Sequence, residues 1–87
     1  MNRASEPLLE LLDDSGVAMN PTGIIFELGD RLDDPPGRST IYRAIDSLIS
    51  AGYIERPVED KALYRITNRG REWLAGDRDA ADDAPEE

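Results

Sequence analysis

The sequence predicts a mainly helical α+β domain: three helices, a two-stranded hairpin and a last helix. Apolar residues recur at intervals of three and four in segments 5–14, 21–29 and 37–51. Two short runs rich in aromatic and β-branched residues, 53–56 and 62–67, flank a polar link, as in a hairpin. Because the chain has only 87 residues, we expect one small core.

The first helix is expected from Ser5, a candidate N-cap, to about Asp14, before the stop signal Gly16. It has more apolar positions than one narrow stripe requires, so part of its leucine surface is expected to be exposed. The leucines are Leu8, Leu9, Leu11 and Leu12. The following residues, Val17 to Met19, can pair as a short strand.

The second helix is expected over 21–29, with Asn20 as cap and Pro21 in the first position, where proline needs no N–H partner. It should bury Ile24, Ile25 and Leu28. The next stretch, GDRLDDPPG, contains two prolines and predicts a turn.

The third helix is expected over 37–51, with Gly52 at its left-handed end. Its apolar stripe consists of Ile41, Ala44, Ile45, Leu48 and Ile49. On a helical wheel the opposite side carries Ser39, Arg43, Asp46 and Ser50, with Thr40, Tyr42 and Ser47 on the flanks. One face is therefore expected to be buried and the other hydrated.

In the second hairpin strand, Arg65 is expected to point outward. Thr67 can cap a last helix that packs Trp73 and Leu74 and ends at Gly76. Residues 77–87 have no hydrophobic side chain larger than alanine, so we expect a domain over 1–76 and a disordered acidic tail over 77–87.

The charge is strongly uneven. The net charge is −9, yet residues 38–71 carry +3, while 1–37 and 72–87 carry −6 each. Nine of the ten basic residues are arginine, a balance that resembles the acidic, lysine-poor proteins of salt-loving archaea. At molar salt the Debye length is about 3 Å, so the acidic ends would no longer repel a polyanion that binds the middle.

Several classes of function are disfavoured. Cysteine and histidine are absent, no nucleophile is paired with a base, and no glycine-rich phosphate loop occurs, so we expect no enzyme and no cofactor. Adjacent acidic pairs such as Asp13-Asp14 are weak evidence for a metal site and fit a solvated surface better. No apolar run approaches the roughly 20 residues of a membrane span, so a cytoplasmic protein is expected.

The order helix, helix, turn, helix, β-ribbon, helix is the winged helix-turn-helix plan. The strings S-T-I-Y-R-A-I-x-x-L-I-x-x-G-Y-I-x-R and Y-R-I-T-x-x-G-x-x-x-L resemble the winged-helix repressors of haloarchaea and their viruses, the halophage phi-H repressor family, and more distantly the PadR and MarR regulators. The resemblance covers residues 20–74 and implies a sequence-specific DNA-binding transcriptional regulator, with repression as the expected activity and double-stranded DNA as partner.

The resemblance implies that helix 37–51 reads the major groove while the wing, 53–67, lies along the backbone or minor groove. Arginine can hold guanine through two hydrogen bonds. The expected DNA contacts are Arg38, Ser39, Thr40, Tyr42, Arg43, Arg56, Lys61 and Arg65.

Each contact has a structural alternative. Arg38 could complement Asp33 or Asp34, Arg43 could pair with Asp46 or Ser47, and Tyr42 could be half core. Ser39 and Thr40 could serve only as helix-start residues. Arg65 could pair with Glu55, and Glu59 and Asp60 make the wing less basic than the family pattern.

A homodimer is expected through the region of Leu8, Leu12, Trp73 and Leu74, which would place two reading helices about 34 Å apart on a palindromic site. The alternative function is a winged-helix adaptor that binds an acidic protein partner and no DNA.

Overall fold

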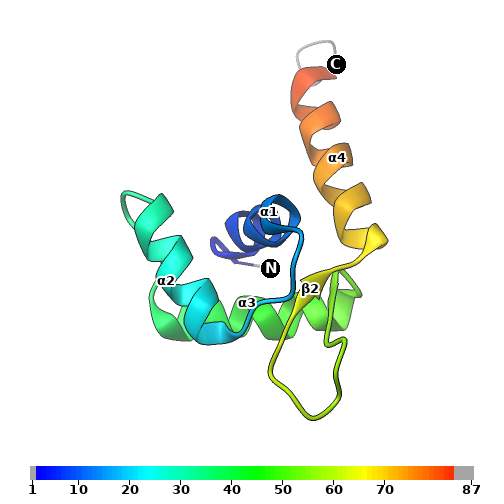
Figure 1. Ribbon diagram of the computed structural model, residues 1–87. Coiled ribbons are helices and arrows are strands. Elements are labelled where there is room, and N and C mark those ends of the chain that lie inside the picture. The colour runs from blue at the N-terminus through cyan, green and yellow to red at the C-terminus, as the bar shows by residue number, and fades with distance from the viewer. Residues whose placement is uncertain (1, 84–87) are drawn as a thin grey trace.

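The computed structural model describes the backbone of residues 2–83 and the side chains of residues 2–76. Its elements are α1 (Ser5–Ser15), α2 (Pro21–Arg31), α3 (Arg38–Ala51), β1 (Ile54–Glu55), β2 (Arg65–Ile66) and α4 (Asn68–Asp83). The fold is mainly helical with one two-stranded antiparallel sheet, so the predicted class and order of elements are confirmed at this level (Figure 1).

Helix α1 lies at the centre of the fold. It contacts α2, α3, α4 and β2, and Figure 1 shows it surrounded by these elements. All four of its leucines are at most 1% exposed, because neighbours cover it on several sides. The expected exposure of α1 leucines is therefore wrong. Leu8, Leu12 and Leu74 are core residues and cannot form the expected dimer contact; Trp73 of that region is half-buried.

The start of α1 also differs from the expectation. Ser5 is buried in the first turn of the helix and is not its N-cap. Instead, the Asn2 side-chain oxygen accepts a hydrogen bond from Ala4 N (2.9 Å), and Ser5 Oγ accepts one from Asn2 N (3.0 Å). This reciprocal arrangement satisfies N–H groups at the helix start in the manner of a capping box.

Local signals set the start of α2 and the end of α3 as expected. Asn20 Oδ1 accepts from Gly23 N at 2.7 Å, with Pro21 in the first turn of α2. Gly52 ends α3 at φ +80°, a conformation that favours glycine. Helix α2 runs two residues beyond the predicted end at Gly29, to Arg31, before the proline-containing turn.

The hairpin is shorter than predicted. Its ladder pairs Ile54 with Ile66 and Glu55 with Arg65, and residues 56–64 form a long connection. Beyond the ladder, Met19 and Tyr64 exchange two backbone hydrogen bonds of 2.9 Å each. The predicted pairing of the 17–19 segment is thus realised as a single bridge.

Helix α4 begins where predicted but is longer. Thr67 Oγ1 accepts from Gly70 N at 3.1 Å and donates to Gly52 O at 2.7 Å, so Thr67 caps α4 and joins it to the end of α3. The predicted end at Gly76 is wrong, since the helical backbone continues through Asp83, where it is rich in alanine and charged residues. The last part of the expected tail, 84–87, lies outside the described residues.

Candidate functional site

The exposed face of α3 is the first candidate site. Ile41, Ala44, Ile45 and Leu48 are buried on the inner face, toward α1. Figure 1 shows α1 on one side of α3 and the 56–64 loop projecting on the other side. The outer face of α3 and this loop therefore look in the same general direction.

Most side chains at the start of α3 are exposed, as predicted. Arg38, Ser39 and Arg43 are exposed, Tyr42 is 45% exposed, and Thr40 is half-buried. Ile49, expected on the buried stripe, is 38% exposed, because it lies at the edge of that stripe on the same flank as Tyr42. The outer face thus combines two cations and a hydroxyl with an apolar flank.

Most basic side chains of the described region have protein partners, but those of α3 do not. Among residues 2–76, only three basic side chains make neither an ion pair nor a hydrogen bond to the protein: Arg38, Arg43 and Lys61. Two of these lie on α3 and the third in the hairpin loop. Within that part of the chain, the unpartnered cations therefore gather on this one side.

The alternative pairings considered for Arg38 and Arg43 are not formed among residues 2–76. Asp34 instead contacts Arg3, whose guanidinium lies 3.6 Å from the carboxylate and donates to the Asp34 carbonyl at 3.2 Å. Asn2 Nδ2 donates to the Thr40 carbonyl at 3.0 Å. Residues 2 and 3 thus hold the turn and the first turn of α3, a role that the sequence analysis missed.

The two arginines of the hairpin bind groups within the hairpin itself. Arg56 donates to the carbonyls of Glu59 (3.0 Å) and Lys61 (3.1 Å), which holds the loop closed on itself. Arg65 Nε donates to Glu55 Oε2 at 2.7 Å across the ladder, so the alternative pairing considered for Arg65 is the one observed. Of the three predicted wing contacts, only Lys61 has a side chain without a protein partner.

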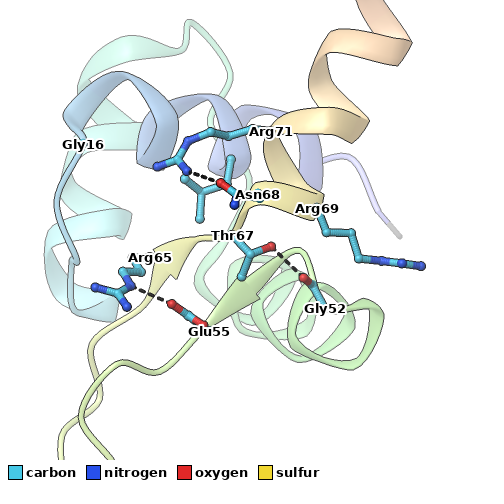
Figure 2. Close-up of a pocket in the computed structure, with 9 residues that line it drawn as sticks. Gly16, Gly52, Glu55, Arg65, Thr67, Asn68, Arg69 and Arg71 are labelled. Carbon is cyan, nitrogen blue, oxygen red and sulfur yellow. Dashed lines mark hydrogen bonds and ion pairs between the residues drawn. The ribbon is translucent and has the colours of Figure 1, made fainter.

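A shallow pocket of about 580 Å³ lies between the hairpin strands and the start of α4 (Figure 2). Three arginines line it, but Figure 2 shows their side chains pointing in different directions. Each already has a partner: Arg65 binds Glu55, Arg69 donates to Ala51 O (2.9 Å), and Arg71 binds Asn68 (3.1 Å). The pocket therefore lacks convergent free groups and is not a second candidate site.

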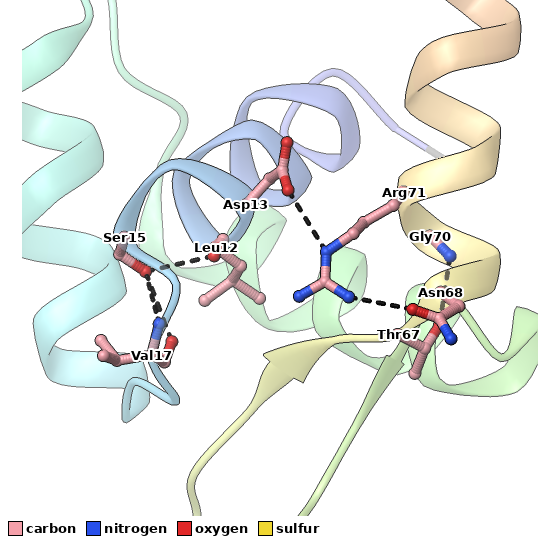
Figure 3. Close-up of polar contacts among 8 residues, drawn as sticks. All are labelled: Leu12, Asp13, Ser15, Val17, Thr67, Asn68, Gly70 and Arg71. Carbon is pink, nitrogen blue, oxygen red and sulfur yellow. Dashed lines mark hydrogen bonds and ion pairs between the residues drawn. The ribbon is translucent and has the colours of Figure 1, made fainter.

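The polar contacts around Arg71 have a structural role. Figure 3 shows Arg71 between Asp13 of α1 (3.5 Å) and Asn68 at the start of α4. The same view shows Thr67 capping α4 through Gly70 N. These contacts attach the first turn of α4 to the end of α1 and leave the α3 face uncovered.

Other site types find little support. Among residues 2–76, whose side chains the structure describes, no group of three or more acidic side chains is arranged to hold a metal ion. None of the helices within residues 2–83 is long and apolar enough to cross a membrane. Comparisons with protein-family models, with curated proteins and with solved structures found no match to this chain.

Proposed function

We propose that this protein is a sequence-specific, DNA-binding transcriptional regulator in which α2, the following turn and α3 form a helix-turn-helix and the hairpin forms a wing. The order of elements supports the proposal, as does the shared direction of the α3 outer face and the hairpin loop (Figure 1). In this arrangement the N-terminal half of α3 enters the major groove and the wing follows the backbone.

One observation carries the proposal: Arg38 and Arg43 are exposed without any ion pair or hydrogen bond to residues 2–76. A guanidinium without a protein partner keeps its full set of donors for guanine O6 and N7. Ser39 lies between the two arginines on the wheel and can donate to a base or phosphate. Lys61 supplies a phosphate contact from the wing.

The test is selection from a random-sequence duplex library in about 1 M KCl, followed by fluorescence anisotropy on the enriched duplex. Arg43→Ala should bind about 5- to 150-fold more weakly, because a bidentate base contact contributes about 1 to 3 kcal/mol. The matched control is Arg31→Ala, since Arg31 pairs with Asp14 and Glu27 away from α3; its affinity should equal that of wild type.

Failure of the folded wild-type protein to enrich any sequence would contradict the proposal. Equal losses in Arg43→Ala and Arg31→Ala would also contradict it, because α3 would then have no special part in binding. Circular dichroism of each variant shows whether the helical content is preserved.

An adaptor that binds a protein partner is the second candidate function. It is favoured by Phe26, whose side chain is 68% exposed in the middle of α2. Aromatic side chains are enriched at protein–protein interfaces relative to the rest of the surface. Co-purification of a protein partner with wild type but not with Phe26→Ser, together with no DNA enrichment, would support this second function over the first.

A further inference from the structure

The DNA-binding face proposed above carries acidic as well as basic groups. Residues 38–65, which include α3 and the hairpin, contain five basic and four acidic side chains, a net charge of +1. A protein that neutralises several phosphates usually does so with a clear excess of lysine and arginine. This face lacks such an excess of basic side chains.

Three of the four carboxylates on this face are not neutralised by the protein. Glu55 is paired with Arg65, but Asp46, Glu59 and Asp60 are exposed and form no ion pair with residues 2–76. Asp46 lies one turn after Arg43 on the same side of α3, yet no ion pair joins them.

These carboxylates would come close to phosphates in the complex. Asp46 shares the outer face of α3 with Ser39 and Arg43, and Glu59 and Asp60 lie beside Lys61 in the loop that projects on that side (Figure 1). A carboxylate next to a phosphate is repelled unless a cation lies between them. The cations condensed on DNA can fill this position if they stay in the complex.

We propose, on the basis of the DNA-binding function above, that cations are retained at the interface beside Asp46, Glu59 and Asp60. Binding then displaces about one net counterion, and the affinity depends only weakly on salt. The slope of log K against log [KCl] is about −0.9 per phosphate neutralised, so the expected wild-type slope is about −1. Displacement of one cation by each of the five basic residues would instead give a slope of about −4.5.

The test measures the affinity of the selected duplex from about 0.2 to about 2 M KCl. Over this tenfold range the wild-type affinity should fall about 10-fold, against about 30,000-fold for a slope of −4.5. The triple variant Asp46→Asn, Glu59→Gln, Asp60→Asn raises the net charge of the face to +4, so its slope should steepen to about −3.6.

Single variants provide the matched control. Asp46→Asn should steepen the slope by about 0.9, whereas Glu72→Gln, on α4 outside this face, should leave it unchanged. Both substitutions remove one exposed carboxylate and keep the side-chain size.

A wild-type slope steeper than about −3, or a triple variant with the wild-type slope, overturns the cation inference while the DNA-binding proposal stands. A Glu72→Gln effect as large as that of Asp46→Asn also overturns it, because the effect would then reflect total charge. Absence of wild-type binding at every salt concentration refutes the DNA-binding proposal itself, so the two failures are distinguishable.

Discussion

Two apolar side chains, Leu8 and Phe26, have opposite exposure to solvent. Leu8 of α1 is fully buried, whereas Phe26 of α2 is 68% exposed, although both lie within helices of 11 residues. The difference arises because Leu8 faces the centre of the fold, while Phe26 lies on the side of α2 opposite Ile24 and Leu28.

We predict that Leu8→Ala lowers the free energy of unfolding by about 2 to 5 kcal/mol, because it leaves a cavity in the core. The control Phe26→Ser should change it by less than about 0.5 kcal/mol. Urea denaturation in high salt measures both. A loss from Phe26→Ser as large as that from Leu8→Ala would show that this ring is covered in solution.

At the scale of residues, local signals were the easiest to predict. Asn20 caps α2 through its side chain, and Gly52 ends α3 through its left-handed backbone. Both act on residues close to them in the chain, so the sequence sufficed to place them. The pairing of Arg65 could only be posed as an alternative, because it depends on strand register. The roles of Asn2 and Arg3 could not be foreseen, since their partners Thr40 and Asp34 are more than 30 residues away.

At the scale of elements, α4 approaches the hairpin very closely at one glycine. A Cβ atom added to Gly70 would lie 2.8 Å from Ile66 Cγ1 and press against the backbone carbonyl of Tyr53. A side chain at this position would push α4 away from the strands. The glycine of the Y-R-I-T-x-x-G motif is therefore required by packing.

We predict that Gly70→Ala lowers the free energy of unfolding by about 1 to 3 kcal/mol, because the backbone carbonyl cannot move aside without disturbing the hairpin. Gly76→Ala is the control: its Cβ would meet nothing within 4 Å, so it should raise stability by about 0.5 to 1 kcal/mol. Thermal unfolding followed by circular dichroism compares them. Changes of the same sign in both variants would disprove the packing argument.

The type and order of the elements were predictable from periodicity, while some bounds and the exposure of α1 were not. Periodicity shows that a helix has an apolar stripe, but the number of neighbours that cover it depends on the whole fold. For this reason the leucines of α1 were expected to remain partly exposed although α1 lies at the centre. Likewise, Gly76 was expected to end the last helix, but α4 continues to Asp83.

At the scale of the whole molecule, the net negative charge is the feature with the largest expected effect on stability. The chain carries −9, and several acidic side chains of residues 2–76 form no ion pair, Asp30 and Glu72 among them. Repulsion among these charges opposes the compact state, and added salt screens it.

We predict that the midpoint of thermal unfolding rises between about 0.05 and 1 M KCl; a gain on the order of 1 kcal/mol would raise it by about 4 to 8 °C. The variant Asp30→Asn, Glu72→Gln should be more stable than wild type at low salt and should gain less from KCl. Scanning calorimetry measures both trends. An unchanged midpoint across this range would rule out charge repulsion as a main determinant of stability.

The bridge between Met19 and Tyr64 has a mechanical consequence. It joins Tyr64, the last residue of the hairpin loop before β2, to Met19, the residue directly before the cap of α2. Since Thr67 also attaches the strand end to the C-terminus of α3, the hairpin is fastened at both sides to the α2–α3 unit. A force applied at the loop tip would be transmitted through these contacts to both helices, so the hairpin would move together with α2 and α3.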